Sequence, residues 1–457
     1  MNKITSRSNT LAVWTSAKTY TRRMALVTVG LLAAQTAYAA DWYVDGLNGN
    51  NNNTGAAAAP FKDPWRAWSK AQPGDTIRLM PTVTYGYIYL GGKSGLPDSP
   101  ITIRGADPKN LTKVSGGGTN YAIMLDGANY VNVQYFDLTA PGHGKYAGWS
   151  ALYSKNNHHV TISHNYAHDS GCAGIQTHHS DYINIMLNRV ERNSKDTWNN
   201  IYCSGISNYN NLDSDTQTGT KMWIQNNIIS GNTNTQSPQC TSPCTNSDGS
   251  GIIIDDSRRT QADYRAYKGA TLIQNNVIFD NGGRGIAIYY SDNVTVRSNT
   301  MYFNNQDPHE GSWRPGEVGI TFSAGVTVTN NIMMTDGLYG SIYTGKRVGV
   351  QATDNGGGSN LPIVIDHNLV YAANGDTTLN YYARNNTVST SYGSKNKWGN
   401  PLFTKASIDP ALAKFSVTSK SPAVNFLAPL DAYSTSDIFW VWRSTYPTAG
   451  AYQKTVN

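Results

Sequence analysis

Hydrophobic and polar positions repeat along this chain in a recurring pattern. A short β-branched run, an Asn and a second apolar run recur seven times, for example in LIQNNVIFDN (272–281) and VTVRSNTMYFN (294–304). The Asn residues of the seven repeats are Asn165, Asn188, Asn227, Asn276, Asn299, Asn331 and Asn368. Their spacings are 23, 39, 49, 23, 32 and 37 residues. A base period of 23 with additions predicts a solenoid whose coils carry loop insertions.

The type of solenoid follows from the length of its elements. Single short strands alternate with tight turns, and no long helical period is present, so we expect an all-β, single-stranded parallel β-helix of about ten coils. Asn suits the corner of each coil because its side chain tolerates left-handed backbone and bonds to nearby backbone groups. Stacking of the coils should place the corner amides in a ladder.

Each coil also contains a strand in which Gly precedes an apolar residue. The strands align on Ile175, Ile206, Ile252, Ile286 and Ile320. The distances from the corner Asn to this Ile are 10, 18, 25, 10 and 21 residues, and those from the Ile to the next Asn are 13, 21, 24, 13 and 11. The insertions therefore flank the Gly-Ile strands, mainly at 193–222 and 230–268. They predict a walled groove with this sheet as its floor.

The N-terminal 39 residues have the pattern of a secretory signal peptide. Basic residues without any acid precede the apolar run MALVTVGLLAA, and the small-x-small sequence Ala37-Tyr38-Ala39 follows. We therefore expect export, to the periplasm, the cell surface or the medium, and the apolar run is too short for a membrane span. Five of the 36 basic residues lie in this segment, which leaves 31 against 30 acidic residues. This balance gives no indication of a nucleic-acid partner.

Four cysteines in an exported chain favour disulfides. Cys172 and Cys203 each stand three residues before an aligned Ile in adjacent coils. The expected Cα separation of about 4.8 Å fits disulfide geometry, so we expect this pair to be bonded. Cys240 and Cys244 would then close a small loop in the longest insertion.

Beyond the repeats, the two ends of the chain resemble a known family. DWYVDGLNG with PFKDPWRAWSKAQPGDTIRL, and NPLFT with KFSVTSKSPAVNF, resemble the opening and the C-terminal cap of the pectate-lyase-like superfamily of secreted right-handed β-helices. The resemblance covers roughly 42–455. It implies a right-handed β-helix at 40–457, with an N-terminal cap (40–100), coils (100–400) and a C-terminal cap (400–457). It also implies a capping helix near 63–72 that has Asp63 as N-cap and Pro64 in its first turn, and a carbohydrate groove over the Gly-Ile sheet.

Candidate chemistry gathers at the end of one Gly-Ile strand, in SDGSGIIIDDSRR (247–259). Strand alternation points Asp255 outward if Ile252 and Ile254 point inward. The same column of neighbouring coils holds His178, Tyr209 and Tyr289, and the next column holds His179, Asn210, Asp256 and Tyr290. Aromatic rings, carboxylates and arginines in one row are suited to a sugar groove. A solvated, charged turn is the plainer interpretation of the same residues.

Three functions fit this cluster. The first is a lyase that cleaves a uronic-acid polysaccharide by β-elimination, with Ca²⁺ held by Asp248, Asp255 and Asp256. In that function Arg259 or Arg284 is the base or the carboxylate clamp. The expected substrate contacts are His178, Tyr209, Tyr289, Tyr290 and Arg258. Family lyases often use a lysine, and we find none on these strands, although Lys268 lies nearby.

The second function is a glycoside hydrolase in which Asp255 or Asp256 is the acid and the other, or Asp280, is the base. The third is a non-catalytic carbohydrate-binding or surface protein. DPHE (307–310) matches a tetrapeptide of mannuronan epimerases but stands in a different place in the coil, so epimerisation is a weaker alternative. The pairs His158/His159 and His178/His179 lack metal-site spacing. We expect a monomer.

Overall fold

A computed structural model of the chain describes residues 39–142, 149–195, 203–234, 246, 248–260, 265–309, 316–338, 346–353, 361–383, 390–426, 434–443 and 447–454. The predicted signal peptide lies almost wholly outside these residues, as do Cys240, Cys244 and Glu310. No helix in the described ranges has the length and apolar character needed to cross a bilayer.

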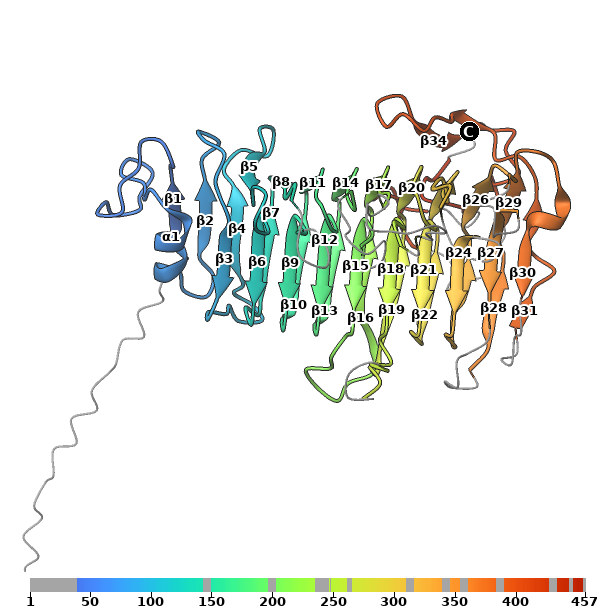
Figure 1. Ribbon diagram of the computed structural model, residues 1–457, viewed down its shortest axis with the longest axis horizontal. Helices are drawn as coiled ribbons and strands as arrows, with labels where there is room; N and C mark the ends of the chain where they lie inside the picture. The colour runs from blue at the N-terminus through green and yellow to red at the C-terminus, as the bar shows by residue number, and fades with distance from the viewer. Residues whose placement is uncertain are drawn as a thin grey trace, which may run out of the picture. The chain divides into compact units, whose positions relative to one another are not determined.

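Three long parallel sheets wind around one core. Figure 1 shows their strands side by side in order along the stack. The first sheet contains β1 (Asp41–Val44), β2 (Thr76–Leu79), β4 (Ile101–Gly105), β7 (Val131–Gln134), β10 (His158–Ser163), β13 (Asp181–Met186), β16 (Gly219–Gln225), β19 (Gly269–Gln274), β22 (Val294–Arg297), β25 (Thr327–Thr329), β28 (Ile363–Asp366) and β31 (Thr390–Tyr392). The second sheet contains β5 (Thr112–Ser115), β8 (Phe136–Thr139), β11 (Tyr166–His168), β14 (Arg189–Glu191), β17 (Ile228–Ser230), β20 (Val277–Phe279), β23 (Thr300–Tyr302), β26 (Ile332–Thr335), β29 (Leu369–Ala372) and β32 (Lys397–Trp398).

The third sheet is the one with the Gly-Ile strands. It contains β3 (Ile88–Gly91), β6 (Ile123–Asp126), β9 (Leu152–Lys155), β12 (Ile175–His178), β15 (Ile206–Tyr209), β18 (Ile252–Asp255), β21 (Ile286–Tyr289), β24 (Gly316–Thr321), β27 (Val348–Ala352) and β30 (Tyr381–Ala383). Each coil passes from the third sheet to the first, then to the second. The predicted right-handed parallel β-helix is confirmed.

The predicted asparagine ladder is also confirmed. Each corner amide donates to the carbonyl oxygen of the next, as from Asn188 to Asn227 (3.1 Å) and from Asn227 to Asn276 (3.0 Å). The ladder continues from Asn368 to Asn396 (3.0 Å). The seven corner side chains are buried, so their mutual bonds satisfy polar groups that would otherwise destabilise the core.

A second asparagine ladder, which we did not predict, lies five residues further along each coil. Hydrogen bonds between side-chain amides, of 3.0, 2.8 and 2.7 Å, connect its members in order: Asn193, Asn232, Asn281 and Asn304. The last member donates to Glu317, which is fully buried. The two ladders fix both ends of the second-sheet strands.

Ile residues from successive Gly-Ile strands stack in the core. Ile175, Ile206, Ile252 and Ile286 pair in register and are inaccessible to solvent. Our alignment of the next coil was wrong by two residues, because Ile286 pairs with Val318 and Ile288 with Ile320. A shift of two residues keeps each side chain on the same face of the strand. The residues predicted to point into the core therefore still do so.

The two segments that we expected to cap the ends of the stack differ from that expectation in detail. Helix α1 (Pro64–Lys70) has Pro at its start, as predicted, but the Asp63 side chain bonds Asn51 and makes no cap bond. The C-terminal segment includes the antiparallel pair β33 (Phe403–Lys405) and β34 (Lys414–Val417), and a short 3₁₀ helix, η1 (Thr377–Leu379), precedes it. That segment packs along the outer face of the second sheet, where Phe415 meets Phe279 and Tyr302 (Figure 1).

Candidate functional site

The row of outward side chains predicted on the third sheet is present. The partners in register are His178 with Tyr209, Tyr209 with Asp255, and Asp255 with Tyr289. Neighbouring positions are about 4.8 Å apart across a parallel sheet. Four consecutive strands therefore bring these side chains onto one face, although 31 to 46 residues separate neighbouring members along the chain.

The row extends toward the N-terminus with two charged residues that sequence reasoning missed. Lys155 of β9 pairs with His178, and Asp126 of β6 pairs with Lys155. The five Gly-Ile strands contain no lysine, as we found, but a neighbouring strand of the same sheet supplies Lys155. The motif ALYSK lacks the Gly that marked the other strands, and this is why the alignment passed over it. The available signal was the spacing, because Leu152 precedes Asn165 by 13 residues, as Ile175 precedes Asn188.

His178 is held by aromatic neighbours. Its Nδ1 lies 3.0 Å from the Tyr153 hydroxyl, and its ring centroid lies 5.0 Å from that of Tyr209 and 3.9 Å from that of His179. Burial, together with the neighbouring His179 and Lys155, lowers the pKa of His178 to about 3. The imidazole is therefore neutral at physiological pH.

The pKa of Asp255 is shifted in the opposite direction from that of His178. Burial raises the pKa of its carboxyl well above the ordinary value, and the negative charges of Asp248 and Asp256 raise it further. Ile253 on the same strand is only 7% exposed although it points away from the core, so the surroundings of Asp255 are largely apolar. A carboxyl whose pKa is raised holds its proton more readily than an ordinary one and is suited to act as an acid.

Asp256 differs from the prediction that it faces solvent or ligand, because the residue is 1% exposed. It occupies a turn with left-handed backbone (φ 45°). Its Oδ1 accepts hydrogen bonds of 2.7 Å from both the backbone N–H and the hydroxyl of Thr260. Residues at this corner are left-handed in six successive coils: Asn156, His179, Asn210, Asp256, Tyr290 and Phe322. Asp256 therefore helps to hold the turn.

The three candidate arginines lie in different surroundings. Arg258 forms a two-pronged ion pair with Asp292, with N–O distances of 3.0 and 2.6 Å, and is 9% exposed. Arg259 is buried and donates to the carbonyl of Asn210 (3.2 Å). Arg284 precedes β21, and its side chain crosses Gly319 on β24, where an added Cβ would clash with it. Of the three, Arg284 is the one that remains half-exposed beside the row.

A cleft of about 690 Å³ lies at the turn after β18. Arg258, Asp292 and Lys268 contribute to its lining, together with Tyr267 and Asp213. Lys268 is exposed and its backbone N–H donates to Asp213 (2.8 Å). This cleft lies beyond the end of the strand, so the sequence correctly placed Lys268 near the row but not on it.

The expected calcium ligands do not form a metal-binding group. Within the described ranges, no three His, Cys, Asp or Glu residues lie close enough together to hold an ion. Asp256 already accepts two hydrogen bonds in its turn, which leaves Asp248 and Asp255 from the expected set. Two carboxylates fall short of the six to eight oxygen ligands that Ca²⁺ usually takes. The expected carboxylates therefore do not make up a calcium site by themselves in the described residues, and the calcium prediction stays a prediction.

Two of the insertions contact each other near the row. Asn246 connects two of them, because its backbone N–H donates to the carbonyl of His309 (2.8 Å) and its side chain bonds Asp307. Asp307 is buried and also accepts from the His309 backbone N–H (2.8 Å). The Asp and His of DPHE thus form a turn packed against the insertion that leads to Asp248. Asp280 lies at the end of β20 in the second sheet, away from the Asp255 row.

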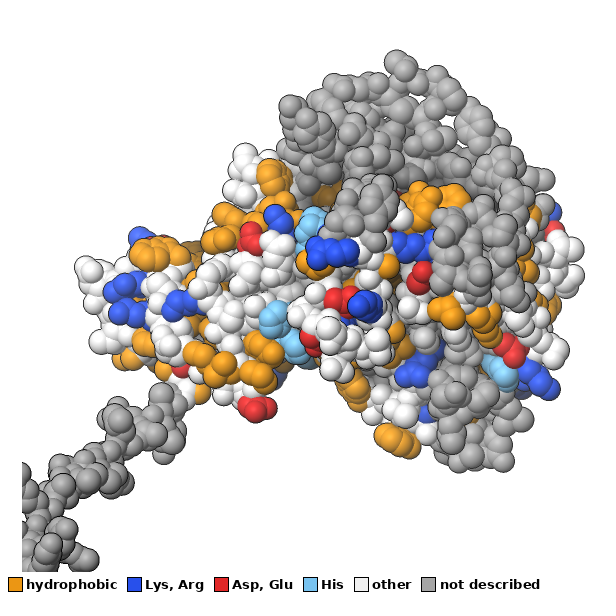
Figure 2. Space-filling view, turned by 90° about the horizontal axis from the view of Figure 1, so that it is seen from below, with side chains coloured by type: hydrophobic (Ala, Val, Ile, Leu, Met, Phe, Trp, Pro, Cys, Tyr) orange, Lys and Arg blue, Asp and Glu red, His pale blue; other side chains and the backbone are white. Residues whose placement is uncertain are grey.

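Charged side chains are dispersed on one face of the molecule. On the face seen in Figure 2, basic and acidic side chains are interspersed, and neither sign gathers into a large patch. This agrees with the near balance of charge outside the first 39 residues. Local groups therefore decide any preference for an acidic ligand.

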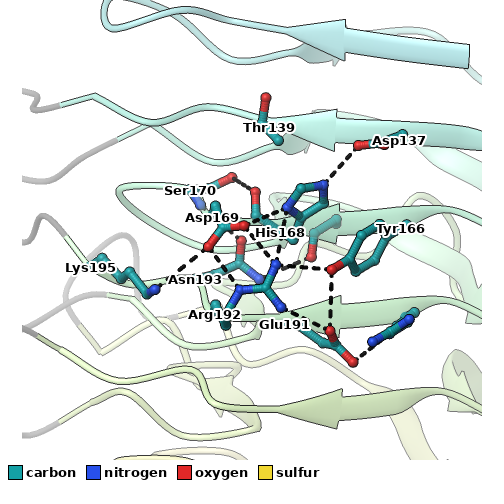
Figure 3. A network of polar contacts seen from close by, with 12 residues as sticks. Asp137, Thr139, Tyr166, His168, Asp169, Ser170, Glu191, Arg192, Asn193 and Lys195 are labelled. Atoms are coloured by element: carbon teal, nitrogen blue, oxygen red, sulfur yellow. Dashed lines mark hydrogen bonds and ion pairs between the residues drawn. The ribbon is translucent and has the colours of Figure 1, made fainter. Parts of the chain in front are cut away.

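The second sheet carries a polar network that the sequence analysis overlooked (Figure 3). His168 lies between two carboxylates, 2.8 Å from Asp137 and 2.6 Å from Asp169. Arg192 bonds Asp169 twice (3.0 and 2.7 Å) and also contacts buried Glu191 (3.1 Å). Burial opposes protonation of His168, but its two carboxylate partners outweigh burial and raise its pKa. These groups satisfy one another, which indicates a structural role.

The disulfide between Cys172 and Cys203 is present, with a Cα separation of 5.1 Å. It connects the segments just before β12 and β15, at the opposite end of these strands from His178 and Tyr209. The prediction for Cys240 and Cys244 concerns residues outside the described ranges.

No family model and no curated protein matches this chain. Among solved structures, the chain is similar to pectate lyase Pel9A, with a TM-score of 0.50 and 18% sequence identity over 92% of this chain and 97% of that one. It is also similar to a structure described as a glycoside hydrolase, with a TM-score of 0.52 and 10% identity over 79% of this chain and 96% of that one. At such identities the likeness concerns the fold, and it confirms the pectate-lyase-like resemblance at that level.

Proposed function

We propose that this protein is an exported polysaccharide-degrading enzyme that cleaves its substrate over the third sheet, with Asp255 as the proton donor. The observation that carries the proposal is the half-buried carboxyl of Asp255, which is in register between Tyr209 and Tyr289 and has a raised pKa. The tyrosine rings supply apolar surface for sugar rings, and the protonated carboxyl supplies the acid that a departing glycosidic oxygen needs.

The reaction that we propose is β-elimination on a uronic-acid polymer. A base removes the proton at C5, the electron pair forms the C4=C5 double bond, and the C4–O bond breaks. The leaving oxygen then takes the proton of Asp255. Lys155 on the row and Arg284 beside it are the cations that favour a substrate with carboxylate groups.

We assign the role of base to His178. It lies two strands from Asp255, or about 10 Å along the row, so the two side chains must lean toward each other over Tyr209 to reach the C5 proton and the O4 oxygen of one sugar residue. In the tautomer in which Nδ1–H donates to the Tyr153 oxygen, Nε2 carries no proton and is able to accept one. The pKa of about 3 applies without substrate. A uronate carboxylate beside the ring raises the pKa of the imidazole toward the pH at which it is an effective base.

Hydrolysis is the second candidate, and the relation between Asp248 and Asp255 favours it. Asp248 is half-exposed, and its charge raises the pKa of Asp255. Two carboxyls whose environments separate their pKa values form an acid and a base in glycosidases. This pair replaces the Asp255–Asp256 pair that we expected, since Asp256 is engaged in its turn.

One experiment distinguishes the two reactions. Purified protein is incubated with polygalacturonate, alginate and neutral arabinoxylan, with and without a chelator. Elimination produces reducing ends together with the ultraviolet absorbance of an unsaturated product, and hydrolysis produces reducing ends alone. We expect the absorbance with a uronan and no effect of the chelator. Loss of activity with the chelator would restore the calcium prediction, and absence of cleavage of all three polymers would contradict an enzyme of this specificity.

Export is part of the proposal. It is supported by the signal-peptide pattern of residues 1–39 and by the Cys172–Cys203 disulfide, a bond typical of oxidising compartments. N-terminal sequencing of protein recovered outside the cytoplasm should begin near residue 40.

A further inference from the structure

A second cleft, of about 710 Å³, opens on the outer face of the first sheet. It lies on a different side of the β-helix from the Asp255 row, between the loop that contains Pro97 and Pro100 and strand β16. Its volume is in the range of small-ligand sites. The proposed catalytic function uses none of its residues.

One wall of the cleft is a rigid column of rings. Tyr130 stacks on His159 with centroids 4.5 Å apart, and His159 stacks on Tyr182 with centroids 4.3 Å apart. The ammonium group of Lys221 lies 5.2 Å from the centre of the Tyr182 ring and closes the column. All three stacked residues have left-handed backbone, with φ of 54°, 57° and 51°. A strained conformation repeated in three coils is a feature that the surrounding structure must maintain.

The floor of the cleft is a row of uncharged polar side chains that ends at a tryptophan. Asn132, Thr161, Asn184 and Trp223 are in register on β7, β10, β13 and β16. This row extends over about 14 Å, which is the length of about three sugar rings in an extended chain. Within the described residues, no ring stacks on Trp223 and no protein group bonds the Thr161 hydroxyl.

A relay of amides orients the floor. Arg297 Nε donates to Gln274 (3.0 Å), Gln274 donates to Gln225 (2.8 Å), and Gln225 donates to the carbonyl oxygen of Asn184 (3.1 Å). Asn184 in turn directs an N–H toward the sulfur of Met186 (3.1 Å), which is a weak acceptor. The relay fixes the orientation of the Asn184 amide. The amide is still able to form a hydrogen bond with a ligand.

The cleft also lacks charge. None of the residues that line it is acidic or basic apart from His159. Burial and the neighbouring His158 lower the pKa of His159, so this ring is neutral at physiological pH. A ligand suited to this surface has hydroxyl groups that pair with amides, an apolar face that packs on an indole, and no net charge.

We infer that this cleft is a second carbohydrate site, which binds a neutral oligosaccharide segment and is separate from the cleavage groove. Trp223 supplies the stacking surface, and Asn132, Thr161 and Asn184 bond the hydroxyls. In an enzyme on a β-helix, such a site holds the protein on a polysaccharide matrix while another chain occupies the groove.

Affinity gel electrophoresis of the Asp255→Asn variant tests this inference. The gels contain soluble arabinoxylan, galactomannan or mixed-linkage β-glucan, and a further gel contains polygalacturonate as the acidic probe. Use of this variant prevents cleavage from removing the ligand. We expect at least one neutral polymer to retard the protein, with an affinity that is insensitive to salt because no charges pair.

Substitutions within this background locate the site. Trp223→Ala should weaken binding of the neutral polymer by about 10-fold or more, since a buried aromatic anchor typically dominates such contacts, and Asn184→Ala should weaken it by a smaller factor. Trp65→Ala removes an indole that is 60% exposed on α1 and is the matched control. Melting temperatures verify that the variants fold.

Two results would overturn the inference. One is the absence of retardation by all three neutral polymers, and the other is retardation that Trp223→Ala leaves unchanged. The outcome is independent of the proposed cleavage, because the assay measures binding by a variant that is expected to be inactive. Failure of the proposed enzyme activity would therefore leave this test intact.

Discussion

Asn304 donates its backbone N–H (3.1 Å) and its side-chain amide (2.5 Å) to the two carboxylate oxygens of Glu317. This contact ends the second asparagine ladder with an acid that is inaccessible to solvent. Burial raises the pKa of Glu317, and although the bonds from Asn304 oppose the rise, the value is about 8.

The linkage between this pKa and stability is measurable. The ordinary pKa is 4.5 and the folded value is about 8, so the folded state binds the extra proton between these values. The free energy of unfolding should therefore fall as pH rises through this window, by at most about 1.4 kcal/mol per pH unit from this group. Glu317→Gln should flatten that part of the curve in denaturant titrations. An unchanged slope would mean that Glu317 is ionised throughout.

The first ladder should be costly to interrupt. Asn227 accepts from the backbone N–H and the side-chain amide of Asn188, and it donates to Asn276 and to the carbonyl of Ile185. Asn227→Ala leaves these buried partners unsatisfied and should lower the free energy of unfolding by about 3 kcal/mol. Asn52→Ala at an exposed position is the control and should change little. Equal stabilities of the two variants would contradict a structural role for the ladder.

The network in Figure 3 predicts a second pH dependence. The pKa of His168 is raised above 6.5, so its contribution to stability is complete below that value and is lost as pH rises through the folded pKa. His168→Gln should remove this loss, whereas His309→Gln, at a half-exposed ring, should not.

At low pH, Asp169 of the same network should also affect stability. Burial raises the pKa of Asp169, but Arg192 and His168 lower it to about 2 overall. Its contribution is present above 3.8 and should disappear as pH falls through about 2.

Asp255→Asn should separate catalysis from stability. We expect turnover to fall by about 10²-fold or more, the usual loss for a positioned acid. Stability should not decrease, because the substitution removes a carboxyl whose charged form is disfavoured by burial. The wild-type rate should decline as pH rises through the raised pKa of Asp255. Asp126→Asn, on the same row, is the control, and near-normal kinetics of Asp255→Asn would place the acid elsewhere.

Asp256→Asn should behave differently from its neighbour. Asp256 is 1% exposed and accepts two bonds from Thr260, so we expect a loss of about 1–2 kcal/mol in stability. Activity per folded molecule should fall less than in Asp255→Asn. Thr260→Ala should reproduce the loss of stability, which thermal denaturation measures. A full loss of turnover in a stably folded Asp256→Asn would instead return this residue to the catalytic group.

Much of the fold could be predicted from the sequence because each coil repeats local rules. The seven corner asparagines gave the period, and strand alternation gave the register of His178, Tyr209, Asp255 and Tyr289. The second ladder could also have been predicted from the sequence, because each of its members follows a corner Asn by five residues: Asn193, Asn232, Asn281 and Asn304. Lys155 was missed because its strand lacks the Gly that we used as a marker.

The sequence by itself determined which residues share a face, because a stacked solenoid converts a local pattern directly into a row. Only the tertiary structure decided which of those residues are available for chemistry. Arg258 forms an ion pair with Asp292, 34 residues away, and Asp256 accepts hydrogen bonds from Thr260. In contrast, burial and the charge of Asp248 raise the pKa of Asp255. These outcomes depend on how insertions of unequal length fold over the sheet. Burial and charge pairing are sums over neighbours in space, and the repeat does not specify those neighbours.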